Sequence, residues 1–173
     1  MPLLNHSSYC EFTEWEMQEN VIKFMSNYKF YRTIVDESWE SASKNVFSEI
    51  HNPTTNRRSD IIIWLNKKTL INIECKLFDV IGVIKQAKDH LCWTDYSYIC
   101  MPHSTYVASC HIAEMIEIGI GLLLYDDENK KIYEVVYAKF NRKKNKIFKE
   151  QAVKKLQSIL NDCKKGQQLQ LVT

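Results

Sequence analysis

The sequence lacks any apolar run that approaches the roughly twenty residues of a membrane-spanning helix, so we expect no membrane partner. Its first residues lack the charged head and the long apolar body of a secretory signal peptide. These two absences favour a cytoplasmic protein. The sequence also contains no Gly-rich phosphate loop, no helicase motif and no internal repeat, which argues against a nucleotide-driven motor and against a repeat protein.

The six cysteines include no Cys-x-x-Cys pair, the arrangement found in many zinc sites. In a cytoplasmic protein we expect reduced thiols that serve mostly as small core residues. One alternative is a structural zinc site with a loosely finger-like spacing. Its members fall on a predicted helix end and a predicted strand end, so we expect no zinc there: they are His90, Cys92, Cys100 and His103.

The composition is that of a globular protein, with 45% hydrophobic and 25% charged residues in a chain of 173. This length suits a single domain with a core of its own. We predict one domain over residues 1–173, with its core at about 11–138. A basic segment at 139–149 and a C-terminal helix at about 147–163 complete it.

A β-hairpin with charged ends is the most informative part of the sequence. Asp60 precedes the apolar run Ile61–Leu65, a polar turn follows at 66–68, and the next strand ends in Glu74–Lys76. The run Ile61–Leu65 is apolar on both faces, which predicts a central strand rather than an edge. Charged side chains at the ends of buried strands indicate a functional site, and surface ion pairs on an exposed hairpin are the alternative.

Strand periodicity places the charged side chains. Alternate side chains of a strand share a face, so Glu74 and Lys76 point together while Cys75 faces the core. Asp60 joins them if the hairpin register sets it opposite Glu74 or Lys76, and a slip of one residue would move it to the Cys75 face. We predict the first register, because an unpaired aspartate on the core face would be costly.

The remaining elements follow from hydrophobic period and turn signals. Thr13 and Glu16 fit a capping box at the start of the first helix. We predict a mobile loop at 37–56 with a short helix at 44–50. The other predicted elements are helices at 11–28, 79–93, 105–118 and 147–163, the hairpin at 60–77, and strands at 29–36, 95–101, 120–125 and 131–137.

This order predicts a mixed central β-sheet flanked by helices, in the α/β or α+β class. Order and residues together resemble the PD-(D/E)xK nuclease superfamily, which has the restriction-endonuclease-like fold. Asp60 stands where the family has its first metal-binding aspartate, with Ser59 in place of the usual proline. Glu74–Lys76 is similar to the (D/E)xK element, and the resemblance covers roughly residues 11–136.

The resemblance implies a Mg²⁺ or Mn²⁺ site formed by Asp60, Glu74 and the main-chain carbonyl of Cys75. It also implies that Lys76 positions the attacking water or stabilises developing charge. A metal beside Lys76 would lower the pKa of its ammonium group and help it to accept a proton.

Family members often add an acidic metal ligand from the first helix, followed four residues later by glutamine. Glu14 and Gln18 match that pattern, with Glu19 as the second choice. Several branches also carry a catalytic glutamine in the helix after the Glu-x-Lys strand. Gln86 fits this position, although His90 stands where a tyrosine would follow.

Basic residues at two places suit a phosphate backbone. Arg57 and Arg58 lead into the predicted site, and solubility is their alternative role. The segment 139–149 holds six basic residues in eleven, with interleaved phenylalanines. We predict nucleic-acid contacts there as well, with a solvated linker as the alternative; the candidates are Arg142, Lys143 and Lys144.

The leading hypothesis is therefore a Mg²⁺-dependent endonuclease that hydrolyses phosphodiester bonds in DNA, in repair, recombination or mobile-element processing. The alternative is a catalytically inactive nucleic-acid-binding module or subunit on the same fold. A homodimer would supply two active sites for two strands, and we keep it as one option.

Overall fold

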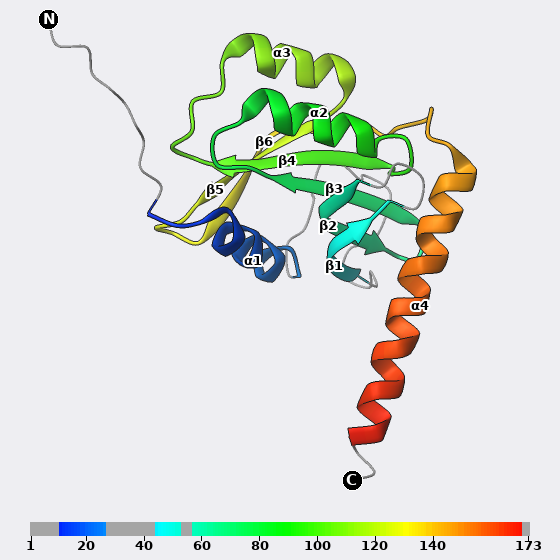
Figure 1. Cartoon of the computed structure of the whole chain (residues 1–173). Helices are drawn as coiled ribbons and strands as arrows, with labels where there is room; N and C mark the ends of the chain where they lie inside the picture. Colours follow the sequence, from blue (N-terminus) through cyan, green and yellow to red (C-terminus); the bar gives the residue numbers. More distant parts are fainter. Residues whose placement is uncertain (1–10, 27–43, 53–56, 171–173) are drawn as a thin grey trace, which may run out of the picture.

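A computed structural model describes residues 11–26, 44–52 and 57–170, with side chains described as far as residue 164. In these parts of the chain, four helices flank a six-stranded sheet (Figure 1). The predicted fold class, a mixed central sheet flanked by helices, is confirmed. The elements are α1 (Glu14–Met25), β1 (Lys44–His51), β2 (Arg58–Leu65), β3 (Thr69–Cys75), α2 (Val80–His90), β4 (Tyr96–Pro102), α3 (Ser109–Ile118), β5 (Gly121–Asp126), β6 (Lys131–Val136) and α4 (Lys146–Gln170).

The strands lie in the sheet in their order along the chain, β1 to β6. Pairs β1–β2, β2–β3 and β5–β6 are antiparallel, whereas β3–β4 and β4–β5 are parallel. The two parallel pairs are joined by α2 and α3, as crossover connections require. The C-terminal ends of β3 and β4 therefore lie at the same end of the sheet. The chain leaves β3 there, at Lys76.

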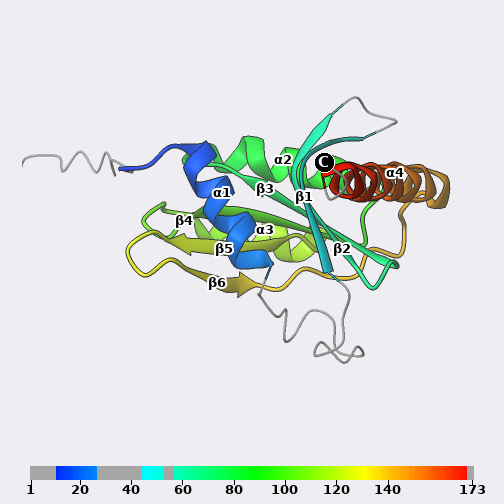
Figure 2. The same ribbon diagram turned by 90° about the horizontal axis from the view of Figure 1, so that it is seen from below.

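Both faces of the sheet are covered by helices (Figure 2). The face with Ile61 and Ile73 packs against α1. The opposite face packs against α2 and α3 through Ile99, and against α4 through Ile62 and Trp64. This double coverage explains why the run at Ile61–Leu65 is apolar on both faces, and it confirms the expectation of a central hairpin.

The predicted hairpin register is the one the structure has. Ile61 lies opposite Ile73 and Ile62 opposite Asn72, so the same register brings Asp60 level with Glu74. The turn after β2 has left-handed backbone at Asn66 and Lys67, with φ of 49° and 56°. Asp60 and Glu74 consequently share the face that lies opposite the α1 core.

The prediction of a loop with a short helix at 44–50 is wrong, because this segment is strand β1. Phe47 and Ile50 are both buried, and their spacing of three residues imitates a helix. Glu49 between them has a left-handed φ of 54°, and both side chains belong to the apolar cluster that contacts α4. The predicted strand at 29–36 lies outside the described residues.

Two helix ends confirm their sequence signals, and one helix differs. The capping box of Thr13 and Glu16 starts α1, and Gly119 ends α3 with a φ of 92°. Helix α4 was predicted to stop at residue 163 but continues to Gln170. In Figure 1 its C-terminal half extends beyond the sheet. Between Leu160 and Leu169 the sequence has no large apolar residue, so no hydrophobic period marks the end of the helix.

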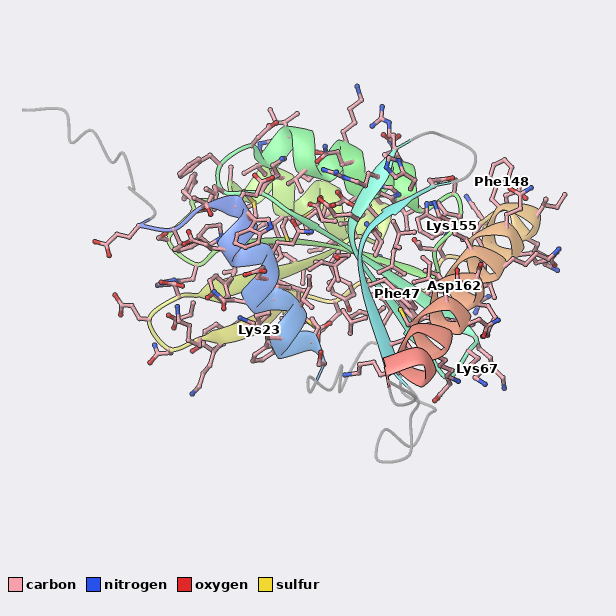
Figure 3. The ribbon with its side chains drawn as sticks, turned by 60° about the horizontal axis from the view of Figure 1, so that its bottom comes forward. Lys23, Phe47, Lys67, Phe148, Lys155 and Asp162 are labelled. Atoms are coloured by element: carbon pink, nitrogen blue, oxygen red, sulfur yellow. The ribbon has the colours of Figure 1, made fainter. Side chains whose placement is uncertain are left out.

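The first half of α4 is fixed to the sheet by an apolar cluster. Phe47 of β1 and Phe148 of α4 belong to this cluster, together with the buried Ala152 and Leu156 (Figure 3). Among the described residues, no helix is both long enough and apolar enough to span a membrane.

Candidate active site

A cavity of about 390 Å³ lies where α1, the start of β2, the end of β3 and α2 come together. It is polar, and it collects side chains that lie up to 76 positions apart in the chain. Seven of the predicted site residues line it, with His90 as the eighth. The lining residues are Glu14, Arg57, Arg58, Asp60, Glu74, Lys76, Gln86 and His90.

Asp60 is fixed from both of its neighbouring elements. Its Oδ2 accepts a hydrogen bond from the backbone N–H of Cys75 at 2.8 Å. Its carbonyl oxygen accepts one from Nε2 of Gln18 at 3.0 Å. Burial raises the pKa of the Asp60 carboxyl, partly offset by the Cys75 hydrogen bond and by the charge of Lys76. Gln18, which we also expect to contact nucleic acid, holds the backbone of Asp60 in this structure.

Glu74 is the most buried carboxyl group of the site, with a side-chain exposure of 2%. Burial, and next the charge of Asp60, raise the pKa of Glu74 to about 8. Its Oε1 atom has no hydrogen-bond partner in the described structure. The charge of Lys76 offsets this effect only in part, so an ionised Glu74 is not fully compensated, and a buried anion without full compensation is disfavoured.

His90 does not supply that compensating charge. Its Nε2 lies 3.3 Å from Oε1 of Glu74, close enough for an ion pair but without hydrogen-bond geometry. Burial lowers the pKa of His90 to about 4, so the ring is neutral near pH 7. Its Nδ1 accepts a hydrogen bond from the indole of Trp93 at 3.1 Å, which assigns the proton of the neutral ring to Nε2.

The donor set fits a hard divalent cation. Asp60 and Glu74 offer two carboxylates on one face, and a cation beside Oε1 of Glu74, which has no hydrogen-bond partner among the described residues, would stabilise the ionised form. Mg²⁺ is commonly held by one or two carboxylates and keeps several waters. In the described part of the chain no three His, Cys, Asp or Glu side chains converge as a ligand group. The side chains that the structure places together for a metal are therefore the two carboxyl groups of Asp60 and Glu74.

Glu14, the predicted third acidic ligand, pairs with Lys76 in this structure. Nζ of Lys76 donates to Oε1 of Glu14 at 2.7 Å. This hydrogen bond raises the pKa of Lys76, a direction opposite to the lowering expected beside a metal. Lys76 is thus held as a cation at the mouth of the cavity, about 29% exposed.

The two arginines have carboxylate partners of their own. Arg57 contacts Asp89 of α2, and Arg58 lies 3.3 Å from Glu49 of β1. Both arginine side chains remain about half exposed, at 45% and 50%, so each keeps donors on the solvent side. Gln86, a residue of α2, lines the same cavity.

The basic segment lies elsewhere. Lys144 and Lys149 form ion pairs with the buried Asp95, at 2.8 and 2.6 Å. Asp95 also accepts a hydrogen bond from the backbone N–H of Leu70, at the start of β3. The cavity is at the other end of that strand, roughly 13 Å away by strand rise. Arg142 and Lys143 are exposed beside this pairing, and Lys144 is occupied by it.

A buried polar network under the cavity was not predicted. Ser59 donates to Asn72, Asn72 donates to Ser97 at 3.0 Å, and Ser97 donates to the carbonyl of Ala87 at 2.8 Å. These bonds connect β2, β3, β4 and α2. The polar residue Asn72, two positions before Glu74 on a buried face, is the sequence signal for it. Ser59, which departs from the family's proline, belongs to this network.

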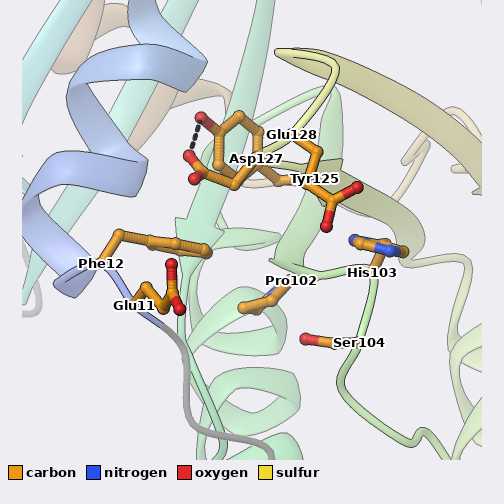
Figure 4. A pocket seen from close by; sticks show the side chains of 8 residues that line it. All are labelled: Glu11, Phe12, Pro102, His103, Ser104, Tyr125, Asp127 and Glu128. Atoms are coloured by element: carbon orange, nitrogen blue, oxygen red, sulfur yellow. Dashed lines mark hydrogen bonds between the residues drawn. The ribbon is translucent and has the colours of Figure 1, made fainter.

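The four residues of the alternative zinc site do not converge. Cys100 lies in the α1 core beside Cys75, its neighbour in the β3–β4 register, whereas Cys92 accepts a hydrogen bond from Asn52. His103 lines a different cavity, of about 270 Å³ (Figure 4). His90 and His103 therefore face separate sites.

No protein-family model matches this sequence, and no curated protein matches it. A solved structure, the SPO1766 protein of unknown function from Silicibacter pomeroyi, is similar over 93% of this chain and 94% of that chain. The TM-score is 0.59 at 15% sequence identity. At this identity the likeness shows the fold alone, so the mixed six-stranded sheet with its flanking helices is an arrangement that a solved protein shares.

Proposed function

We propose that this protein is a metal-dependent nuclease that hydrolyses phosphodiester bonds in DNA, in repair, recombination or mobile-element processing. One observation carries the proposal: two carboxyl groups, of the half-buried Asp60 and the buried Glu74, share a cavity with the cation Lys76, and Oε1 of Glu74 has no hydrogen-bond partner in the described part of the chain. The resemblance to PD-(D/E)xK nucleases supports the same reading of these residues.

Asp60, Glu74 and the carbonyl of Cys75 would hold Mg²⁺ or Mn²⁺, which when bound activates water and stabilises charge on phosphoryl oxygens. Hydrogen bonds within the protein position the aspartate among these ligands. Gln18 fixes the backbone of Asp60, and the Cys75 N–H fixes its carboxylate, so the distance between the two acidic strands is set before any ligand binds.

Lys76 acts in this proposal as a fixed positive charge and not as a base. Its raised pKa keeps it protonated, so it stabilises negative charge on a phosphate in the cavity. Arg57 and Arg58 offer further donors to the neighbouring phosphates on the solvent side. Gln86 adds an uncharged donor and acceptor to the same wall.

The test is cleavage of single-stranded, duplex, flap and four-way-junction DNA in Mg²⁺ and in Mn²⁺. We expect metal-dependent products from the natural protein and a loss of at least about 100-fold in rate for Lys76→Ala, the scale of one electrostatic catalytic group. Lys68→Ala is the matched control, since Lys68 is an exposed lysine in the hairpin turn at the far end of the same strands. Equal rates for the two variants would refute the role of Lys76.

The second candidate is a catalytically inactive nucleic-acid-binding module. It is favoured by one observation, that Glu14 pairs with Lys76 and leaves two carboxylates, without a third acidic side chain, at the metal position. DNA binding with no products in either metal, at any enzyme concentration, would support this candidate. We place the protein in the cytoplasm in both cases, in keeping with the five described cysteines, which are all free thiols.

A further inference from the structure

Large apolar side chains are exposed where the chain leaves β3. Trp15 is 63% exposed, Phe78 57% and Tyr106 83%. We call these three the aromatic rim. The aliphatic Ile81, 69% exposed at the start of α2, lies next to it in the chain. Exposed aromatic groups that gather in one place indicate a binding surface, because single exposed apolar residues are normally scattered.

Residues next to the three rings contact Lys76 and Leu77, which brings the segments that carry the rings to the end of β3. Trp15 follows Glu14, whose carboxylate binds Lys76 at 2.7 Å. Tyr106 follows Thr105, whose hydroxyl donates to the carbonyl of Leu77 at 2.8 Å. Phe78 is the residue after Leu77. The three exposed rings thus come from three segments of the chain. Each ring belongs to a residue directly next to one that contacts, or belongs to, the end of β3.

The cavities on the two sides of the rim differ in charge. On one side is the active-site cavity, where the cations Arg57, Arg58 and Lys76 stand beside three carboxyl groups. On the other side is the second cavity, whose described wall residues carry three carboxylates and include no lysine or arginine (Figure 4). They belong to Glu11, Asp127 and Glu128. The first cavity thus offers cationic donors to a phosphate, whereas the second repels it.

We propose that the aromatic rim stacks the unpaired bases of single-stranded DNA and places the adjacent phosphate in the Lys76 cavity. This inference rests on the proposed nuclease function and names its substrate class. Aromatic side chains stack on any base, but only where the base is free of its own duplex neighbours. Rings beside the site therefore favour single strands, flaps and frayed ends over intact duplex.

The experiment measures the affinity of metal-free protein for a labelled oligo(dT) and for a duplex of the same length, by fluorescence anisotropy. Replacing Trp15, Phe78 or Tyr106 by alanine should weaken oligo(dT) binding about tenfold for each ring, the usual effect of losing one stacked base. Duplex affinity should stay within about twofold. Tyr133→Ala is the matched control, because Tyr133 is 49% exposed on the edge strand β6.

Four outcomes would overturn the inference. Unchanged oligo(dT) affinity in all three variants removes the stacking role, and an equal loss for duplex removes the strand selectivity. Tighter binding of oligo(U) than of oligo(dT) removes DNA as the ligand. Self-association of the natural protein that the alanine variants abolish, without a change in DNA affinity, would assign the rim to a second copy of the chain.

These outcomes distinguish a failure of the stacking proposal from a failure of the nuclease proposal. If the rim variants lose oligo(dT) binding while the natural protein cuts nothing in Mg²⁺ or Mn²⁺, the rim stands and the nuclease proposal fails. If the natural protein cuts DNA and the rim variants keep full affinity, the nuclease stands and the rim fails. Absence of any DNA binding would overturn both.

Discussion

Asp60 and Cys75 are joined across the hairpin by a hydrogen bond of 2.8 Å from the Cys75 N–H to the aspartate carboxylate. This bond lies at the point where strands β2 and β3 reach the edge of the sheet. It fixes Asp60 beside Glu74, and it continues the pairing of the two strands beyond Ile61 and Ile73, the last backbone partners at this end. One carboxylate therefore serves the fold and the proposed site together.

Replacing Asp60 by Asn should separate those two roles. The amide oxygen can still accept the Cys75 hydrogen bond, so the melting temperature in metal-free buffer should change little. The variant should lose metal-dependent stabilisation, which any ligand that binds the native state produces. A titration of melting temperature against Mg²⁺ checks this, with Asp162→Asn on the exposed part of α4 as the control. A natural protein whose melting temperature ignores Mg²⁺ and Mn²⁺ alike would contradict a metal at Asp60.

The raised pKa of Glu74, about 8, makes stability depend on pH in metal-free buffer. The folded protein binds more protons than the unfolded chain between the ordinary value near 4.5 and about 8, so stability falls as pH rises through this window. His90, with its pKa lowered to about 4, has the opposite effect and makes stability rise with pH between about 4 and 6.5. The net loss of stability should therefore be clearest between pH 6.5 and 8.

Glu74→Gln should abolish that loss, because glutamine keeps the shape without the charge. At pH 8 the variant should be more stable than the natural protein by on the order of a few kcal/mol, and the difference should shrink at lower pH. Urea unfolding at several pH values measures it. If the natural protein and the variant lose stability in parallel from pH 6.5 to 8, Glu74 does not carry the effect.

Glu14→Gln should act on Lys76 more than on the fold. The ion pair is partly exposed, with side-chain exposures of 29% and 40%, so its loss should cost about 0.5 kcal/mol or less. The same change should lower the pKa of Lys76, since the Glu14 hydrogen bond is the largest cause of its raised value. Titration of Lys76 by NMR in the natural protein and in the variant checks the direction. An unchanged Lys76 pKa would show that the pair does not persist in solution.

The hairpin was predictable because two independent constraints agree there. A buried run at Ile61–Leu65 fixes the strand, and the costly burial of an unpaired Asp60 fixes the register. The partners of Lys76 were not predictable to the same degree. Periodicity placed Glu14 on the first helix, yet only the packing of that helix decides whether its carboxylate meets a metal or the lysine.

Local sequence patterns could not predict strand β1 or the ion pairs of Asp95. The left-handed backbone at Glu49 breaks the alternation of β1, so its period is lost from the sequence. Asp95 gathers two lysines from a segment about fifty residues later, and no spacing rule connects them. In both places a tertiary contact decides the structure, and local propensity does not.

Gly121→Ala should destabilise the sheet by about 1–3 kcal/mol, the usual cost of overpacking. A Cβ atom at this position would overlap with the ring of Tyr98, on the neighbouring strand β4, and would lie 2.9 Å from the backbone nitrogen of Ala138. Thermal unfolding measures the loss. Adding Tyr98→Leu should recover part of it by removing the ring, and a double variant no better than Gly121→Ala would place the clash at the backbone instead.

Asp95→Asn should loosen the attachment of α4 and of the basic segment before it. The carboxylate is 2% exposed and compensates Lys144 and Lys149, while the amide that replaces it can still accept the Leu70 hydrogen bond. The lysines are 12% and 21% exposed and can turn to solvent, so we expect a moderate loss of stability, about 1–3 kcal/mol.

Hydrogen exchange in the Asp95→Asn variant should quicken in the first turns of α4 and stay unchanged in α1. Because these lysines would then be free to contact phosphates, the variant should also bind duplex DNA more tightly at low salt. A variant with normal exchange in α4 and unchanged DNA affinity would mean that the apolar cluster around Leu156 alone holds the helix and that the two ion pairs do not restrain the basic segment.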